Sequence, residues 1–249
     1  MRLLRLALYI FLAAMLWGYI SSDNNLPAEA DHAKQLFSAT AAKAHRFINL
    51  SEAVKTGVSS QPGVYIPLAQ IPLSLQQALI ATEDARFYRH HGIDFEGIAR
   101  ALFTNLQDRQ FTEGGSTITQ QLVKNLFLSQ EKTLSRKLEE LILAVGVEFH
   151  FSKEEILEMY LNRIYYGSGA YGIASAADIY FGKRPNDLTL AESALLVGLP
   201  QAPSVYSPYT NFQAAKLRQT AVLDLMVKQG FISSNSADKA KREPIHLSR

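Results

Sequence analysis

The distribution of apolar and polar residues along the chain predicts a succession of helices from about residue 70 onward. In residues 136–150 the apolar side chains recur at the helical period, at Leu138, Leu141, Ile142 and Val145. Capping residues mark the other expected helix starts. The expected helices are 74–90, opened by Ser74 and ending before Gly92; 94–106, capped by Asp94; one beginning at Thr117; 136–150; two beginning at Ser152 and Thr189; and 213–229, ending at Gly230. The pattern predicts a mainly α-helical globular domain.

The N-terminus has a different pattern. Arg2 and Arg5 precede an unbroken apolar run, Leu6–Ile20, which reaches spanning length when the preceding leucines and the aliphatic stem of Arg5 are included. The run has no clear small-x-small cleavage site, and aromatic residues lie near its end, where an interfacial belt is expected. We therefore expect one uncleaved transmembrane anchor over residues 1–22, with the arginines in the cytoplasm and the rest of the chain outside it.

Composition and charge narrow the possible functions. The sequence has 25 Lys and Arg against 23 Asp and Glu, so bulk electrostatics give no attraction to nucleic acid, and any anion site must be local. The absence of cysteine excludes disulfides and thiolate metal sites. After the anchor we expect a linker and amphipathic segment over residues 23–64, with a helix near 30–54, and then one catalytic domain over residues 65–249.

Two adjacent carboxylates, Glu83 and Asp84, lie within the expected helix 74–90. Glu83 is flanked by apolar residues, and a carboxylate partly shielded in this way is more basic, which suits a general base. The alternative is a solvated pair that bonds Arg86 and Arg89, and this segment alone favours that alternative. His90, seven residues after Glu83, is expected on the same helical face and is by itself more typical of packing than of catalysis.

A glycine-led helix start forms a second candidate feature. Residues 114–117 precede or open the expected helix, where backbone N–H groups and the helix dipole favour a bound anion. Gln120, Gln121 and Lys124 extend the polar contacts along the helix. An ordinary capped helix with a flexible entry explains the same residues equally well. The P-loop spacing is absent, which argues against a nucleotide site.

A third feature is the segment Arg136-Lys137-Leu-Glu-Glu140, which places an arginine and a glutamate four residues apart on a helix. Such a pair usually stabilises the exposed surface of a helix. The arginine precedes the glutamate, which is the less stabilising order, so this explanation is somewhat weakened. The segment adds a second carboxylate and two cations to the candidate residues.

Taken together, these segments resemble the peptidoglycan glycosyltransferase family, which includes monofunctional membrane transglycosylases and the glycosyltransferase domains of class A penicillin-binding proteins. The resemblance covers roughly residues 65–235, and five segments follow the family's order. The segments are Glu83-Asp-x-x-Phe87-x-x-His90-x-Gly92-x-Asp94; Gly114-Gly-Ser-Thr-Ile-Thr-Gln-Gln-x-x-Lys-Asn125; Arg136-Lys-x-x-Glu140; Lys153-x-x-Ile156-Leu-Glu-x-Tyr160-Leu-Asn162-x-Ile-Tyr165-x-Gly167; and Ala191-Glu-x-Ala-x-Leu-x-Gly198-Leu-Pro-Gln-Ala-Pro203.

The resemblance implies a lysozyme-like helical fold with a small membrane-apposed lobe near residues 95–115. It also implies polymerisation of lipid II, in which a glycan chain on undecaprenyl pyrophosphate is the donor and the 4-hydroxyl of lipid II attacks with inversion. By position, Glu83 would be the general base, Glu140 the second catalytic carboxylate, and Lys124 and Arg136 the cations that hold the pyrophosphate. The residues expected to bind substrate or shape the site are Asp84, Phe87, His90, Thr117, Gln121, Asn125 and Lys137.

The same resemblance sets expectations for location and partners. We expect a single-pass protein of the cell (inner) membrane whose catalytic domain lies on the periplasmic face. Its expected partners are lipid II, the growing glycan chain, the membrane and cell-wall synthesis proteins, but not nucleic acid. No metal site and no required cofactor are expected, although Mg²⁺ or Mn²⁺ would be compatible with a supporting role at the pyrophosphate.

Two alternatives remain beside this interpretation. One is a membrane-anchored, lysozyme-like glycan hydrolase, and the other is an inactive scaffold of the wall-synthesis machinery. Four residues argue against the hydrolase and the scaffold: Glu83, Lys124, Arg136 and Glu140. A hydrolase of soluble glycan needs no cations that hold a pyrophosphate, and a scaffold needs none of these four groups. Because the chain ends at Arg249, we expect a monofunctional enzyme.

Overall fold

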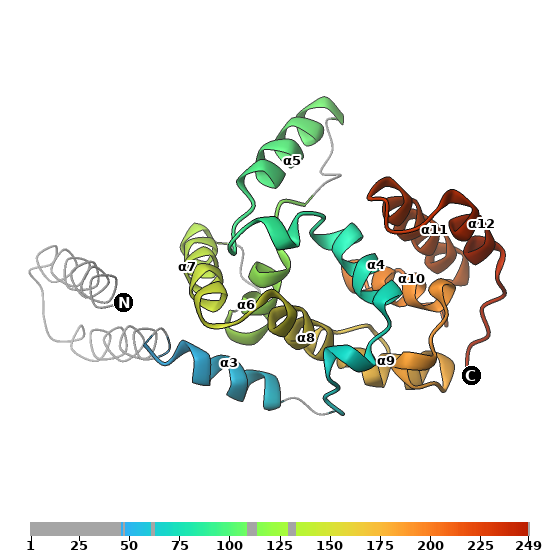
Figure 1. Ribbon diagram of the computed structural model, residues 1–249, viewed down its shortest axis with the longest axis horizontal. Coiled ribbons are helices and arrows are strands. Elements are labelled where there is room, and N and C mark those ends of the chain that lie inside the picture. Colours follow the sequence, from blue (N-terminus) through green and yellow to red (C-terminus); the bar gives the residue numbers. More distant parts are fainter. Residues whose placement is uncertain (1–45, 47, 61–62, 109–113, 129–132, 249) are drawn as a thin grey trace, which may run out of the picture. The chain divides into compact units, whose positions relative to one another are not determined.

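The computed structural model describes residues 46, 48–60, 63–108, 114–128 and 133–248 (Figure 1). The expected anchor over residues 1–22 lies outside these residues, as does most of the expected segment 23–64. Within the described ranges, no helix combines the length and the apolar character needed to cross a bilayer. The chain divides into two compact units, Met1–Ala53 and Val54–Arg249, and the elements described below belong to the second unit apart from the start of α3.

The described residues are mainly helical, as predicted, and their only β-type pairing is an isolated bridge between Tyr165 and Tyr171. Four short 3-10 helices punctuate the chain: η1 (Leu68–Gln70), η2 (Phe87–Arg89), η3 (Pro185–Asp187) and η4 (Leu199–Gln201). The α-helices are α3 (Leu50–Ser59), α4 (Leu73–Glu83), α5 (Phe95–Asp108), α6 (Ile118–Phe127), α7 (Leu134–His150), α8 (Lys153–Arg163), α9 (Gly172–Phe181), α10 (Leu190–Gly198), α11 (Phe212–Lys228) and α12 (Ser234–Arg242).

Local capping explains where several helices begin. Ser152 with Glu155, and Thr189 with Glu192, form complete capping boxes at the starts of α8 and α10, as predicted. The Thr117 hydroxyl caps α6 by accepting the backbone N–H of the third helical residue. These starts were predictable because each depends on residues only three positions apart.

The structure differs from the sequence prediction at the cap of α4 and in the segment after α11. α4 begins directly after Pro72 with no side-chain cap, so the predicted cap at Ser74 is wrong. The predicted last helix is present as α11, but α12 follows it. Most of α12 is polar, and its buried residues are Ala237 and Ala240. Two alanines give a weak hydrophobic period, so the pattern of apolar residues did not predict this helix.

The predicted helix 74–90 also ends early, at Glu83. Asp84 leaves helical geometry, with φ −159° and ψ 73°. Its carboxylate accepts a hydrogen bond from the backbone N–H of Ile118 and contacts His90, so contacts with distant segments outweigh local helix propensity. As a result Glu83 is the last residue of α4, and His90 does not share a helical face with it.

The helices form two sets, and the helices within each set contact one another (Figure 1). α10 contacts both α4 and α11, and α4 also contacts α11. In the second set α6 contacts α7 and α8, and α8 contacts α9. α10 is buried along nearly its whole length, from Ala191 to Gly198, and forms the centre of the first set. The C-terminal end of α4 carries Glu83 toward the start of α6.

α7 is a helix, as its apolar period predicts, but part of that period faces outward. Leu138 and Ile142 are exposed, whereas Glu140, Leu143 and Val147 are buried. The period therefore identified the helix correctly, but it did not show which of its faces packs against α6.

Gly92 lets the loop after η2 approach α7 closely. Its φ is +87°, and a Cβ added there would lie 2.9 Å from the carbonyl carbon and oxygen of Ala144. The Gly92 carbonyl in turn accepts hydrogen bonds from Thr117 Oγ1 at 2.8 Å and Gln120 Nε2 at 3.1 Å. The loop is thus tied to the start of α6 at a point where only glycine fits.

We expect Gly92→Ala to lower the free energy of unfolding by more than the roughly 1–3 kcal/mol that a strained positive φ costs by itself. The reason is that the new methyl group also meets backbone atoms of α7, which can move only by disturbing packing. Urea denaturation measures the loss. Gly230→Ala is the matched control, since Gly230 has φ +74° and no atom within 4 Å of its added Cβ. Equal losses for the two variants would show that the close approach contributes nothing.

Candidate active site

A cavity of about 690 Å³ opens at the C-terminal end of α4. Its walls come from α4, α5, the segment before α6, the first turns of α6, η4 and α11. The charged and polar residues that line it are Glu83, Asp84, Asp94, Arg100, Arg218, Lys228, Thr82, Thr104, Ser116, Thr117, Gln121, Gln201 and Gln229. The cavity is therefore strongly polar and carries both carboxylates and cations.

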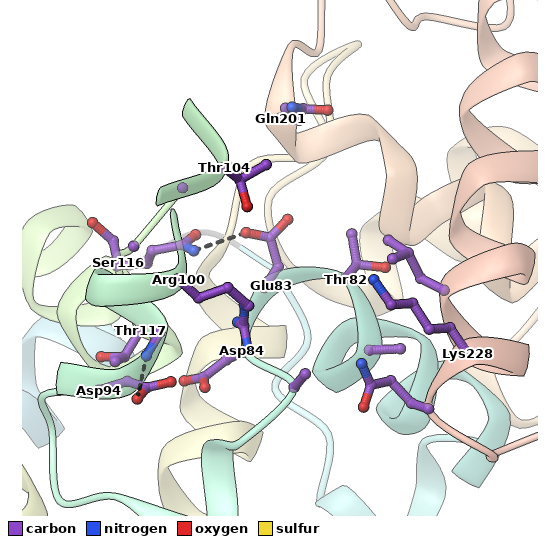
Figure 2. Close-up of a pocket in the computed structure, with 18 of the residues that line it drawn as sticks. Thr82, Glu83, Asp84, Asp94, Arg100, Thr104, Ser116, Thr117, Gln201 and Lys228 are labelled. Atoms are coloured by element: carbon purple, nitrogen blue, oxygen red, sulfur yellow. Dashed lines mark hydrogen bonds between the residues drawn. The ribbon is translucent and has the colours of Figure 1, made fainter. Parts of the chain in front are cut away.

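The Glu83 carboxylate points into this cavity (Figure 2). In the view of Figure 2, Arg100 and Thr104 of α5 lie on one side of it and Lys228 of α11 on the other. Glu83 Oε2 accepts a hydrogen bond of 2.8 Å from Gln121 Nε2. A carboxylate held by a neutral donor at the edge of an open cavity can accept a proton from a hydroxyl group of a bound molecule.

Asp84, the neighbour of Glu83, is engaged with the protein itself. Its two carboxylate oxygens each lie 3.0 Å from His90 Nε2, and one of them also accepts the Ile118 N–H at 3.0 Å. Ile118 begins α6, so the helix dipole also favours the negative charge. Phe87 is buried edge-on against His90, and Lys153 lies 4.5 Å from the centroid of the Phe87 ring. Phe87 and His90 thus support the site from behind and do not line the cavity.

A second carboxylate lies behind the segment before α6. Glu140 is only 2% exposed, and it bonds Arg136 Nη1 at 3.1 Å as well as the Lys137 ammonium. Lys137 Nζ also donates to Ser116 Oγ and Gln120 Oε1, each at 3.1 Å. Since Ser116 lines the cavity, Lys137 connects the buried Glu140 to the cavity wall. Two cations surround one carboxylate, which leaves this cluster with a net positive charge.

Two predicted residues of α6 lie farther along the helix. Lys124 is half-buried and Asn125 is exposed, and neither belongs to the residues that line the cavity. Lys124 is the seventh residue of a ten-residue helix, so it lies nearer the C-terminal end than the N-terminal one. The helix dipole at the start of α6 therefore acts on residues 114–117 and Gln121, which do line the cavity, more than at Lys124.

Three lining cations were not singled out from the sequence: Arg100, Arg218 and Lys228. Arg100 lies on α5, and Arg218 and Lys228 both lie on α11. Basic residues scattered along a helix usually indicate a solvated face. Only the packing of α5 and α11 around the end of α4 brings them to the cavity.

Asp94, which is predicted as a helix cap and ends the first segment of the family resemblance, also lines the cavity. It caps α5 by accepting the Gly97 N–H at 2.9 Å and pairs with the Arg86 guanidinium. Burial would raise the pKa of Asp94, but the bonds from Arg86 and Gly97 outweigh it and lower this pKa. Asp94 is thus held as a paired anion at the cavity wall.

The sequence is similar to a known protein family and to several known proteins. The sequence model of the family described as Transglycosylase matches residues 51–227. Penicillin-binding protein 1A of Neisseria gonorrhoeae is 49% identical over 185 residues, and penicillin-binding protein 1A/1B of Bacillus subtilis is 50% identical over 186 residues. Each match covers 74% of this chain but only 23% and 20% of the respective relative, so the chain spans less than a quarter of their length.

A solved structure also matches. The crystal structure of penicillin-binding protein 1A from Haemophilus influenzae has a TM-score of 0.46 and 28% sequence identity. The match covers 76% of this chain and 19% of that chain.

Proposed function

Since this chain belongs to the transglycosylase family, whose sequence model matches residues 51–227, we propose that it is a peptidoglycan glycosyltransferase that polymerises lipid II into glycan strands. One observation carries the proposal: the Glu83 carboxylate points into a polar cavity, is bonded by Gln121, and has cations on more than one side. A reaction that needs a base close to a diphosphate leaving group fits this arrangement.

In the proposed reaction, Glu83 takes the proton from the 4-hydroxyl of the incoming lipid II. The hydroxyl oxygen then bonds to the anomeric carbon of the donor chain, and the bond from that carbon to undecaprenyl pyrophosphate breaks with inversion from α to β. The leaving pyrophosphate takes the bonding electrons, so cations near it stabilise the transition state. Lys124 and Arg136, which lie outside the cavity lining, are the cations proposed for this role from the family resemblance, and Glu140 would hold Arg136 in place.

The proposal extends to the fold and to the membrane. We assign a lysozyme-like fold with a membrane-apposed lobe near residues 95–115, part of which lies outside the described residues. On α5, Phe95, Ile98 and Phe103 are exposed, while the same helix contributes Arg100 to the cavity. Exposed apolar side chains next to the cavity would let a lipid-linked substrate enter from a bilayer surface.

The remaining expectations become part of the proposal. Residues 1–22 would anchor the chain in the inner membrane with the catalytic domain on the periplasmic face. Lipid II and the growing glycan chain would be the substrates, and cell-wall synthesis proteins the further partners. No cofactor would be required, and Mg²⁺ or Mn²⁺ would be compatible with a supporting role at the pyrophosphate.

Incubating the purified full-length chain with labelled lipid II distinguishes the candidate functions. A ladder of longer glycan strands supports the proposed polymerisation. Cleavage of supplied glycan strands without lengthening would instead identify the lysozyme-like hydrolase. Unchanged lipid II and unchanged strands, with a folded protein, would favour the inactive scaffold.

The role of the two proposed cations can be tested separately. We expect Lys124→Met to reduce single-turnover rates by roughly 100-fold, as removal of a transition-state stabiliser commonly does, and to weaken lipid II binding much less. Arg136→Lys should keep part of the activity, because lysine retains the charge but not the bidentate fork. Single-turnover kinetics and binding measurements on both variants test these expectations.

The matched control for the loss of a lysine charge is Lys183→Met, since Lys183 pairs with Glu192 of α10 and does not line the cavity. This variant should turn over like the wild type. If Lys124→Met weakened binding alone and left turnover unchanged, the leaving-group role of Lys124 would have to be abandoned.

A further inference from the structure

The amide of Gln121 lies between the proposed base and a buried tyrosine. Its Nε2 donates to Glu83 Oε2 at 2.8 Å, and its Oε1 accepts from the Tyr160 hydroxyl at 2.8 Å. Each end of the amide is thus bonded to a different helix, Glu83 on α4 and Tyr160 on α8. A glutamine side chain has three rotatable bonds, so without a bond at both ends it would sample several positions.

Tyr160 is suited to fix that amide because it is itself immobile. It is 1% exposed and belongs to the core of α8, which packs directly on α6. Burial, and then the negative charge of Glu83, raise the pKa of Tyr160 well above its ordinary value. The phenol therefore keeps its proton at any working pH and remains a hydrogen-bond donor, for which the Gln121 carbonyl is the bonded acceptor.

The orientation of the amide matters for Glu83. With Oε1 bonded to Tyr160, the NH₂ group faces the carboxylate, which is the favourable arrangement. If the amide turned over, its carbonyl oxygen would face a negatively charged oxygen and repel it. A carboxylate bonded through one oxygen is also fixed in direction, so its other oxygen can be aimed at a bound hydroxyl.

We propose that Tyr160 is a positioning residue for the general base: its hydroxyl anchors Gln121, which holds one oxygen of Glu83 and directs the other toward the acceptor hydroxyl. Tyr160 contacts neither the cavity nor the substrate in this scheme and acts only through Gln121. The inference rests on the proposed function, because it assigns a purpose to the geometry around Glu83.

The test is a double-mutant cycle on polymerisation of labelled lipid II. Tyr160→Phe should lower kcat by roughly 10- to 100-fold, the size of effect that a displaced catalytic group produces, and leave KM within about twofold of the wild-type value. Gln121→Leu should lower kcat at least as much. Because Tyr160 acts through Gln121, the double variant should be no slower than Gln121→Leu alone.

Tyr180→Phe is the matched control. Tyr180 is a fully buried tyrosine whose hydroxyl bonds the Tyr166 carbonyl at 3.0 Å and Ser168 Oγ at 3.1 Å, away from Glu83. This variant also removes one buried hydroxyl, so it reports what the loss of such a group costs in general. A Tyr160→Phe variant that behaved like Tyr180→Phe, or one whose effect added fully to that of Gln121→Leu, would overturn the inference.

A second readout does not depend on activity. Hydrogen exchange of the Gln121 side-chain amide, followed by NMR, should be faster in Tyr160→Phe than in the wild type and unchanged in Tyr180→Phe. Equal exchange in wild type and Tyr160→Phe would show that no anchor exists, whatever the enzyme does. Wild-type protein with a protected amide but no polymerisation would contradict the proposed function and leave the anchor standing.

Discussion

Glu83→Gln should reduce polymerisation of lipid II by at least about 100-fold, the effect typical of losing a general base. The substitution keeps the size of the side chain, and the new amide oxygen can still accept the hydrogen bond that Gln121 Nε2 gives to Glu83. The cavity should therefore keep its shape while losing its proton acceptor. Initial rates with labelled lipid II measure the effect.

Glu154→Gln is the control for this prediction, because Glu154 is an exposed carboxylate in the first turn of α8 that does not line the cavity. Its turnover should match the wild type. If folded Glu83→Gln protein polymerised lipid II at a near-wild-type rate, Glu83 would have no part in the mechanism.

Glu140→Gln should damage both stability and turnover. The glutamine would leave Arg136 and Lys137 facing a neutral amide in a buried position, and removing one partner of a buried ion pair costs about 3–5 kcal/mol. Because the side chains of Arg136 and Lys137 are 18% and 39% exposed, water relieves part of the cost, and we expect about 3 kcal/mol or less. Turnover of the folded fraction should fall on the order of 100-fold, since Arg136 loses its fixed position.

Glu192→Gln separates the two effects. Glu192 is also buried and pairs with Lys183, but it belongs to α10 and does not line the cavity. Its substitution should lower the free energy of unfolding, measured in urea, and leave the single-turnover rate unchanged. A Glu140→Gln variant with the same profile would make Glu140 a structural residue only.

The features that the sequence predicted correctly are those that depend on neighbouring residues. The capped starts of α6, α8 and α10 follow from Thr117, Ser152 and Thr189 and from residues three positions later. The mainly helical class follows from the apolar period in the same way. No distant contact is needed for either, which is why a linear pattern is sufficient.

The features that it missed depend on contacts between distant segments. α4 ends at Glu83 because Asp84 bonds the start of α6, thirty-four residues away, although the residues after Asp84 favour a helix. Arg218 and Lys228 reach the cavity only through the packing of α11 against α4. A single sequence holds no local signal for such contacts, so the cationic wall on this side of Glu83 could not be predicted.

The candidate site shows the same division. Glu83, Asp84, Thr117 and Gln121 were predicted and line the cavity, whereas Lys124 was predicted from the same glycine-led segment and lies outside the lining. The position expected for Lys124 depends on how α6 is oriented relative to α4. The spacing of residues within α6 does not determine that orientation. The role of Lys124 thus remains a prediction for the kinetic comparison above.

Glycosyl transfer from the proposed donor releases undecaprenyl pyrophosphate, whereas hydrolysis of glycan strands does not. The decisive measurement therefore follows free undecaprenyl pyrophosphate together with strand length. Full-length protein and labelled lipid II should give one undecaprenyl pyrophosphate for each disaccharide added to a strand, and Glu83→Gln should give neither product. Strands that shorten, or that stay unchanged while the wild-type protein is folded and lipid II is intact, would contradict polymerisation by this chain.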